Sequence, residues 1–551
     1  MGCRRLSATT TGQINVNRLA GEPKLMPMAL KLGTAPLQNE VFRNLFLALM
    51  ISNIGLWMQT VGAQWFLVDA NAGPAVISLV QTASLLPTLV FSLLAGVLAD
   101  VLNPKRLLIV MTVYAVVIAG VMAGLAWSGL LTPPILLVLT FLLGSGAALS
   151  APAFQAIQPE LVPRDQIADA ASLGSVAMNT ARAVGPALAG VLFTFGGAGT
   201  VFAVNAVSYV AVLFALLTWR RPPKAADVER EHIAMSMTVG MRYLAAAPVV
   251  QRLLLRAALF ALPASALWAL LPVVARSHFH FDSTGYGVLL GLLGVGAVCG
   301  MFVLPAIRAT ISSDLLLAGS ALLFAGGTVA AGFAPFGWAA VPLFLAGFGW
   351  TAQLSTLNAA MQLTLPQWVR ARGMSMYLLV FMGLQGLGAF GWGLLGQSLS
   401  PGTALAIAAG LLVSAAATAT VLPLHPMTAQ LDRTLFVTWP VPNLVFEPGP
   451  SDGPVQIEVT YRVEPENRQA FLTAMTPLAG SRRRTGGRSW RLYQTGEEPD
   501  TYIEQFVVPS WSEYQRQRTQ RWTGFDHENI LRVAAVAERE GQRHLFTEAV
   551  H

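Results

Sequence analysis

Charged residues are scarce in this sequence: 11% of its 551 residues are Asp, Glu, Lys or Arg, whereas 54% are hydrophobic. So few charges cannot cover a water-soluble surface, which excludes one large soluble domain. Cysteine is nearly absent, with Cys3 in a polar leader and Cys299 inside an apolar run, so neither a disulfide framework nor a thiol-metal site is expected. The composition predicts a bundle of membrane-spanning helices embedded in the lipid bilayer.

Basic residues outnumber acidic ones and give a net charge of +7, but they stand mostly in short loops between apolar runs. That distribution is typical of membrane topology, so no nucleic-acid partner is expected. Glycine-rich runs near 287–300 and 383–396 lack the strand-to-helix context and the Lys-Ser/Thr ending of nucleotide loops. The sequence therefore predicts no cofactor, no metal and no ATP-driven step.

Twelve apolar runs are long enough to cross a bilayer as helices, which takes roughly 20 residues each. They cover 42–68, 75–99, 107–131, 134–157, 170–195, 201–219, 253–275, 285–307, 315–333, 338–365, 374–399 and 402–424. The turn after the fourth run begins Pro-Glu-Leu-Val and the turn after the tenth begins Pro-Gln-Trp-Val, so the two halves echo each other. Two six-helix halves joined by a basic loop, 220–252, predict the parallel-repeat plan of rocker-switch transporters.

Lys and Arg residues occupy alternate loops, and such loops stay on the cytoplasmic side of a membrane. Lys105 and Arg106 follow the second span, Arg164 the fourth and Arg308 the eighth. The intervening loops are almost bare, with Arg276 as the exception. We therefore expect a multi-pass protein of the bacterial inner membrane with both termini in the cytoplasm.

The turn between the second and third spans reads Gly96-Val-Leu-Ala-Asp100-Val-Leu-Asn-Pro-Lys105-Arg106. It resembles the signature loop of the major facilitator superfamily, approximately Gly-x-Leu-Ala-Asp-Arg-x-Gly-Arg-Arg. Gly96, Asp100, Lys105 and Arg106 match, whereas Val and Asn replace the signature's first Arg and its second Gly, which thins the local charge network. The resemblance implies that Asp100 latches the cytoplasmic side until the halves rock apart. The alternative is a turn that merely carries topology-setting charges.

The fifth span contains Ala181-Arg182-Ala-Val-Gly185-Pro186-Ala-Leu-Ala-Gly190, which resembles the antiporter signature of drug exporters in the same superfamily. Gly185 and Gly190 leave room for close helix contact, and Pro186 removes a backbone donor and bends the helix. Arg182 lies near mid-span, where a charge is costly unless it faces protein or water. It is expected to be a cation in or near the cavity, or else a structural Arg bonded to carbonyls or amides. The resemblance favours export over uptake.

Spans 1, 4, 7 and 10 usually line the cavity in this superfamily, and polar amides are scattered over three of them. The candidate cavity residues are Asn53, Gln59, Gln64, Gln155, Gln158, Trp268, Gln353, Asn358 and Gln362. Each amide alone is equally well explained as a bond between helices, whereas the set would suit a bulky solute that is partly aromatic and partly polar. Glu160 is the candidate proton relay with the Asp100 loop, and a plain surface role is its alternative.

A proline-rich linker, 425–454, precedes a compact region at 455–551. Strands are expected at 455–463, 489–495, 501–508 and 544–550, with helices at 465–480 and 528–540. This βαββαβ order predicts a cytoplasmic ferredoxin-like domain, similar to dimeric α/β-barrel domains and a candidate for homodimerisation. Some α/β-barrel relatives are monooxygenases, so a membrane-anchored enzyme or a regulatory protein acting through this domain is the alternative function. His527 and His544 are isolated and give it weak support.

The whole chain is similar to the transmembrane secretion effectors, a branch of the superfamily that includes enterobactin exporters. The similarity rests on Asn205–Ser208, Pro366–Arg372, Arg482–Arg484 and Ser510–Glu513. It implies an all-α polytopic membrane protein of the major facilitator fold, with six-helix bundles at 41–219 and 253–424, plus a small α+β domain. Residues 1–40, which precede the first apolar run, are expected to form a disordered cytoplasmic tail. The implied function is a secondary active transporter, not an enzyme, that exports small amphiphilic molecules (a siderophore, a drug or another metabolite) by alternating access, with protons as the antiported ion.

Overall fold

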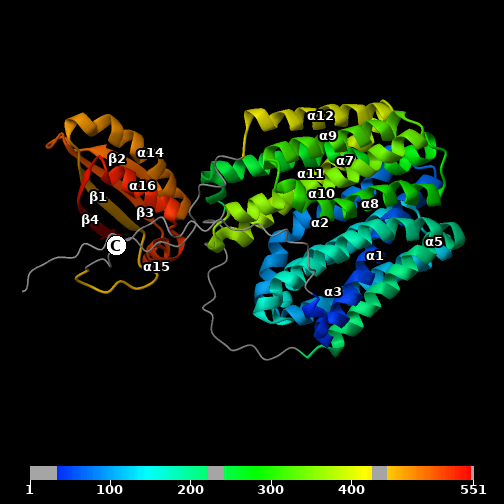
Figure 1. Ribbon diagram of the computed structural model, residues 1–551. Coiled ribbons are helices and arrows are strands. Elements are labelled where there is room, and N and C mark those ends of the chain that lie inside the picture. Colours follow the sequence, from blue (N-terminus) through cyan, green and yellow to red (C-terminus); the bar gives the residue numbers. More distant parts are fainter. Residues whose placement is uncertain (1–33, 221–240, 242, 425–443, 548–551) are drawn as a thin grey trace, which may run out of the picture.

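The computed structural model describes residues 34–220, 241, 243–424 and 444–547. They form a helical bundle and a small α/β domain beyond one end of it (Figure 1). Three expected segments are only partly described. The structure leaves out residues 1–33 of the tail expected at 1–40, residues 221–240 and 242 of the loop expected at 220–252, and residues 425–443 of the linker expected at 425–454.

Eleven long helices build the bundle in the described part of the chain. The first half holds α1 (Glu40–Asp69), α2 (Pro74–Val101), α3 (Pro104–Trp127), α4 (Pro133–Ile157) and α5 (Ile167–Thr218). The second half holds α7 (Pro248–Ser277), α8 (Ser283–Arg308), α9 (Ser313–Phe333), α10 (Phe336–Thr364), α11 (Gln367–Ser398) and α12 (Pro401–Val421). Gly197, at a φ of 68°, breaks α5 into two limbs that correspond to two expected spans.

Ten of these helices, with α5 counted once, are long and apolar enough to span a membrane in the described residues. The second limb of α5 and the 29-residue α10 bring the bundle to the twelve expected segments. The predicted fold class is thereby confirmed.

Prolines and short polar caps mark where the helices begin. The helices α2, α3, α4, α7 and α12 each carry a proline in the first turn, where its missing N–H costs nothing. The side chains of Asn39, Asp282 and Ser312 accept hydrogen bonds from first-turn N–H groups of α1, α8 and α9. The sequence of the short turns therefore sets the helix boundaries.

The bundle has two ends, which we name by residues. The Asp69 end is where α1 stops and α2 begins, and the Lys105 end is where α2 stops and α3 begins. The helices alternate in direction, so α5 and α11 start at the Lys105 end and α8 starts at the Asp69 end.

Helices α5 and α8 join the halves through close packing of small residues. A Cβ at Gly190 would lie 2.5 Å from the carbonyl oxygen of Ser283, and a Cβ at Gly287 would lie 2.8 Å from that of Pro186. The hydroxyls of Thr194 and Ser283 also lie 2.9 Å apart. Because any side chain at these glycines would collide with backbone, the motif that ends at Gly190 serves to seat α5 on α8.

Helices α2 and α11 form the second junction between the halves. The hydroxyl of Thr82 donates to the carbonyl oxygen of Gly386 at 2.8 Å, which fixes the two helices near mid-span. Nearer the Asp69 end, the N–H of Ala75 donates to Oε1 of Gln397 at 3.4 Å. The two junctions place the contacts between the halves in the middle of the bundle and toward its Asp69 end.

The C-terminal domain is a four-stranded sheet with helices against one face. Its elements are β1 (Val455–Arg462), α14 (Arg468–Thr485), β2 (Arg488–Gln494), β3 (Thr501–Val508), α15 (Trp511–Arg516), the π-helical turn η6 (Gln517–Arg521), α16 (Gly524–Ala534) and β4 (Glu538–Phe546). The strand order is β2-β3-β1-β4 with antiparallel pairing throughout, which is the expected ferredoxin-like arrangement. Alternate residues of β1, starting at Val455, are buried.

The last two elements of this domain differ from the sequence-based expectation. The helix α16 ends at Ala534 and β4 already begins at Glu538, whereas 528–540 was expected to be helical and 544–550 to be the strand. β4 is an edge strand whose first four residues are all exposed, so its first half lacks the alternation that identifies half-buried strands. Residues 548–550 lie outside the described part.

A buried charge network organises the core of the C-terminal domain. The Arg482 guanidinium donates to both carboxylate oxygens of Glu504, at 2.9 and 3.1 Å, while Tyr461 and Trp490 donate to the same carboxylate. Burial opposes ionisation of Glu504, but the positive charge of Arg482 and these three donors outweigh it and lower the pKa of the carboxyl. The domain is therefore held by a paired charge that is fully hydrogen-bonded on the carboxylate side.

Replacing Gly287 with Ala should destabilise the bundle, because the new Cβ would lie 2.8 Å from the Pro186 carbonyl oxygen. The expected loss is about 1–3 kcal/mol, measured as a lower Tm of the full-length chain in detergent. The matched control is Gly291→Ala on the same helix, whose Cβ would have nothing within 4 Å. That variant should gain up to about 1 kcal/mol, because Ala favours a helix over Gly. Equal Tm values for the two variants would contradict the packing argument.

The C-terminal domain should lose stability as pH falls from about 6.5 toward 4. Burial, with the charges of Arg539 and Arg518, lowers the pKa of His544 to about 4, so over this window the unfolded histidine takes up a proton that the folded one refuses. His544→Gln can still bond to the Tyr514 hydroxyl, which lies 2.9 Å from the imidazole Nε2. In this variant the protection of backbone amides from hydrogen exchange should fall less steeply as the pH is lowered. Hydrogen exchange of β1 and β4 amides, compared between the two full-length chains at each pH, measures this. Parallel pH profiles would count against it.

Candidate functional site

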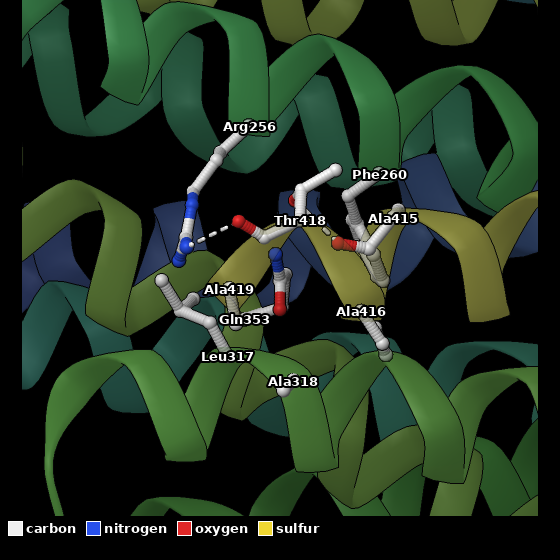
Figure 2. Close-up of a pocket in the computed structure, with 10 residues that line it drawn as sticks. Arg256, Phe260, Leu317, Ala318, Gln353, Ala415, Ala416, Thr418 and Ala419 are labelled. Carbon is white, nitrogen blue, oxygen red and sulfur yellow. Dashed lines mark hydrogen bonds between the residues drawn. The ribbon is translucent and has the colours of Figure 1, made fainter. Parts of the chain in front are cut away.

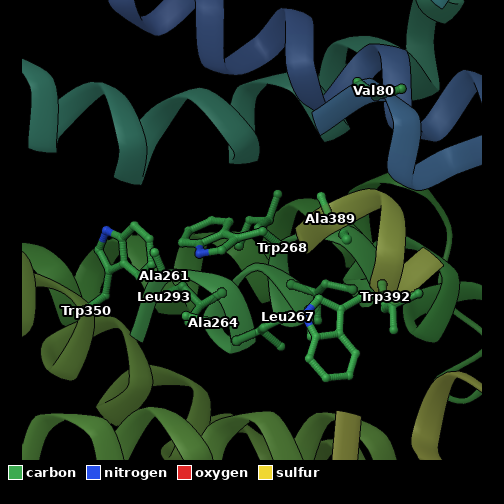
Figure 3. Packing of buried hydrophobic residues seen from close by; sticks show 14 of the residues in the cluster. Val80, Ala261, Ala264, Leu267, Trp268, Leu293, Trp350, Ala389 and Trp392 are labelled. Carbon is green, nitrogen blue, oxygen red and sulfur yellow. The ribbon is translucent and has the colours of Figure 1, made fainter. Parts of the chain in front are cut away.

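An aromatic cluster lies where the halves meet at mid-span. Trp57 of α1 is 6.0 Å from Trp268 of α7, and Trp268 is 5.3 Å from Trp350 of α10, measured between ring centroids. Phe260 and Phe381 pack against Trp350 at 5.8 and 5.7 Å. Figure 3 shows the indoles of Trp268 and Trp350 side by side, with small residues of α7 next to them. The cluster crosses from one half to the other, so it is placed to sense their relative motion.

Arg182 stands at the first-half edge of this cluster. Its guanidinium carbon lies 5.4 Å from the centre of the Trp57 ring, and Nη1 donates to the Asn179 amide oxygen at a long 3.5 Å. Among the described residues, Nε of Arg182 is buried without a hydrogen-bond acceptor. A charge at mid-span costs at least about 2.5 kcal/mol, and a desolvated cation–π contact returns roughly 2 kcal/mol. The described residues thus compensate this charge only in part.

On the Asp69 side of the cluster the halves are sealed by polar bonds. Gln64 donates to the carbonyl oxygen of Trp268 at 3.3 Å and accepts from the Tyr286 hydroxyl at 2.6 Å. The ring of Trp65 stacks on Tyr286 at 5.7 Å. Gln64 is therefore a bond between α1, α7 and α8 in this conformation.

The other predicted cavity amides divide into bonded and exposed groups. Gln59 accepts from Asn205 at 3.2 Å and Gln353 accepts from Ser320 at 2.6 Å, and both glutamines are buried. Gln155 and Gln362 are exposed, and Gln362 donates to Asn358 at 2.7 Å; Asn53, Gln158 and Asn358 are partly buried. The two exposed amides, Gln155 of α4 and Gln362 of α10, lie on the Lys105 side of mid-span.

The antiporter-like motif acts first as a packing motif. A Cβ at Gly185 would lie 2.6 Å from Cβ of Trp57, so this glycine brings α5 against α1 directly behind the aromatic cluster. Pro186 and Gly190 meet α8 as described above. The three residues fix where Arg182 enters the cluster.

The gating motif is partly described. Lys105 donates from Nζ to the carbonyl oxygen of Trp219 at the end of α5, and Arg106 is exposed. Gly96 and Asp100 fall in α2, but their surroundings lie outside the described part of the chain. Glu160, the candidate relay, is partly buried in the short helix η3 (Gln158–Glu160) near the Lys105 end.

Sequence reasoning missed a buried ion pair in the second half. Nη1 of Arg256 on α7 lies 2.7 Å from Oδ1 of Asp314 on α9, and Nη2 donates to the carbonyl oxygens of Thr418 and Leu422 on α12. Figure 2 shows Arg256 reaching Thr418 beside a hollow of about 10 Å³, the size of one water molecule, that Gln353 also lines. Both charged residues stand at span ends, where they look like ordinary boundary charges in the sequence. A test for basic–acidic pairs at matching depth would have found them.

The C-terminal domain touches the bundle at the start of α11. The Arg521 guanidinium carbon lies 5.2 Å from the centre of the Trp368 ring, and Tyr243, just before α7, packs edge-on against the same ring at 5.4 Å. Glu513 holds Arg521 in place through two hydrogen bonds of 2.7 and 3.2 Å. This contact, the Trp368 dock, joins the domain to a helix that forms one of the two junctions between the halves.

Solved transporter structures resemble the bundle. A bacterial homologue of the human lysosomal transporter Spinster, inward-facing and unoccupied, gives a TM-score of 0.54 at 17% identity and covers 72% of this chain and 98% of its own. The nucleoside transporter NupG gives 0.56 at 13% identity, with 69% and 98% covered. Such a likeness concerns the fold alone, which is that of a helical transporter bundle.

The particular family follows from the sequence. Residues 32–547 match the family model described as transmembrane secretion effector, and the chain belongs to that family. The staphyloferrin A transporter of Staphylococcus aureus is 25% identical over 254 residues, which are 46% of this chain and 64% of that protein. The enterobactin exporter EntS of Citrobacter koseri is 28% identical over 337 residues, 59% of this chain and 77% of its own. The expected family and the class of small-molecule transporter are confirmed.

Removing the charge of Asp314 should destabilise the second half strongly. Asp314→Asn would leave Arg256 buried without its carboxylate, which costs about 3–5 kcal/mol and lowers the Tm of the full-length protein. The matched control is the double variant Arg256→Met with Asp314→Asn, which removes both charges and should recover much of the loss. A single variant within about 1 kcal/mol of the wild type would show that the pair contributes no more than a surface salt bridge.

Proposed function

We propose that this chain exports small amphiphilic molecules, siderophores among them, from the cytoplasm by alternating access, with protons as the antiported ion. The family, together with relatives that are a staphyloferrin A transporter and enterobactin exporters, supports this choice of cargo. The observation that carries the proposal is the asymmetry of the bundle about its aromatic cluster. The halves are bonded to each other on the Asp69 side, while polar amides are exposed on the Lys105 side.

Charge supports placing the Lys105 end in the cytoplasm. Lys105, Arg106, Arg308 and Arg370 lie at that end, and cytoplasmic loops carry the excess of Lys and Arg. In that orientation the bonds between the halves at Gln64 lie toward the far side and the exposed amides lie toward the cytoplasm, which supports a state open to the cytoplasm. An exporter loads its cargo in such a state, and both termini would then be cytoplasmic.

Coupling requires a group whose protonation differs between the two states. Asp314 is already paired with Arg256, which makes it a poor acceptor in this conformation. Asp100 and Glu160 near the Lys105 end remain our candidates, with Asp100 as a latch and Glu160 as a relay. Both would exchange protons with the cytoplasmic side while the cavity is open to it.

For the C-terminal domain we propose regulation of transport, with homodimerisation as a further role. The Trp368 dock supports this, because Trp368 is the second residue of α11 and any rocking of the second half must move or break the contact. The alternative, a monooxygenase-like enzyme, would place the activity in the domain itself. His544 offers it little, since its imidazole is engaged with Tyr514 and Gln542.

Everted membrane vesicles with an acidic interior should take up members of an amphiphile panel only while the pH gradient lasts. Asp100→Asn should slow this flux by about tenfold, the effect of losing one charge-assisted hydrogen bond, while the protein still inserts. Asp165→Asn, an exposed acidic residue outside the motif, is the matched control and should transport normally. No gradient-dependent uptake of any panel member would argue against export.

The same vesicles separate a regulatory tail from an enzymatic one. A chain truncated after Leu424 and the undocked full-length variant Trp368→Leu should both keep gradient-driven flux and should shift its rate in the same direction. If truncation abolishes the activity and Trp368→Leu leaves it untouched, the activity resides in the C-terminal domain and the enzyme alternative is favoured.

A further inference from the structure

Two arginines within the bundle, Arg256 (buried) and Arg182 (partly buried), differ in how their charges are met. Arg256 has Asp314 at 2.7 Å and two backbone carbonyls. Arg182, in the described part of the chain, has a long bond to an amide and the face of Trp57, with no carboxylate. The second half therefore supplies a counter-charge to Arg256, whereas no described residue supplies one to Arg182.

The surroundings of Arg182 lack hydrogen-bond acceptors as well. Trp268 and Trp350 are 8% and 5% exposed, and the indole N–H of each is buried without an acceptor among the described residues. Buried polar groups are normally hydrogen-bonded, so two unmet donors in one cluster are unusual. With Nε of Arg182 they make three buried donors along a single chain of ring contacts.

The rings themselves set the shape of a ligand. The ring centroid of Trp268 lies 6.0 Å from that of Trp57 and 5.3 Å from that of Trp350. Trp350 in turn packs against Phe260. Flat π faces pack best against another flat ring. Trp57 comes from the first half and the other two from the second, so one ligand could engage both halves.

We propose that Arg182, Trp57, Trp268 and Trp350 form the binding site for an anionic aromatic group of the cargo. The carboxylate or phenolate pairs with the Arg182 guanidinium at the face of Trp57, its ring lies against the tryptophans, and the indole N–H groups of Trp268 and Trp350 donate to further polar oxygens of the cargo. The proposal rests on the export function proposed above and assigns it a substrate class. Arg182 then selects cargo by charge and Trp350 by hydrogen bonding.

Binding to the full-length protein in lipid nanodiscs, without any gradient, tests the site. The probes are 2-naphthoate and its neutral isostere 2-naphthamide, which share a ring and differ in charge. Wild-type protein should bind the anion at least about tenfold more tightly, the effect of roughly one charge-assisted hydrogen bond. Arg182→Gln should lose this preference, and Arg182→Lys should keep part of it. Arg276→Gln, an exposed Arg at the Asp69 end, is the matched control and should bind as the wild type.

A second variant keeps the test decisive if Arg182→Gln fails to fold. Trp57→Leu removes the ring that the Arg182 guanidinium faces but leaves the charge in place, so it should weaken 2-naphthoate several-fold more than 2-naphthamide. Wild-type protein that binds both probes equally, or neither, would overturn the proposal. Displacement of 2-naphthoate by chloride would also overturn it, because the site would then recognise inorganic anions. Equal affinities for 2-naphthoate and cyclohexanecarboxylate would do the same, because the site would then not recognise the aromatic ring. If the vesicles show gradient-driven transport but the nanodisc protein does not prefer the anion, the proposed binding site is wrong and the export function stands. If the nanodisc protein prefers the anion but the vesicles show no gradient-driven transport, the export function is wrong and the binding site stands.

Discussion

Within a bilayer no water drives helices together, so the bundle depends on how closely backbones can approach. The two junctions between the halves show this dependence. At α5 and α8, glycines admit a backbone carbonyl of the neighbouring helix where a side chain would collide, and at α2 and α11 a threonine bonds directly to the carbonyl of Gly386. These contacts lie in the middle of the bundle and toward its Asp69 end. Each joins two separate helices, so it can break without unfolding either helix. A junction of this kind is stable in one position and can be remade in another.

The architecture followed from the sequence because its signals are local. A span needs only a run of apolar residues, and prolines with short polar caps mark its ends. The family signature likewise occupies one turn, so Gly96, Asp100, Lys105 and Arg106 identified the fold class before any contact was known. The edge strand β4 was misplaced for the opposite reason: its exposed first residues carry no alternating pattern, since the sheet has no neighbour on that side.

The site could be anticipated only in outline, because its chemistry lies between distant segments. Gln64 was expected in a cavity and instead bonds Trp268, 204 residues away; Gln353 likewise bonds Ser320. The Arg256–Asp314 pair could not be seen from either residue alone. Amide side chains are ambiguous in a membrane, since the same group can hold two helices together or hold a solute. In a rocking transporter one amide can do both in turn, so the bond of Gln64 to Tyr286 in this conformation leaves a cargo role open in the opposite one.

The Trp368 dock connects these observations to the C-terminal domain. Arg521 is fixed by Glu513 inside the domain, so its guanidinium reaches Trp368 without the mobility of an ordinary surface side chain. Trp368 begins α11, whose far half carries the Gly386 bond to α2, and a rigid helix transmits a displacement at one end to the other. Tyr243, which closes the same contact, comes at the end of the segment that joins the halves. The domain therefore contacts both α11 and the end of the segment that joins the halves, so a displacement of either one relative to the other would change this contact.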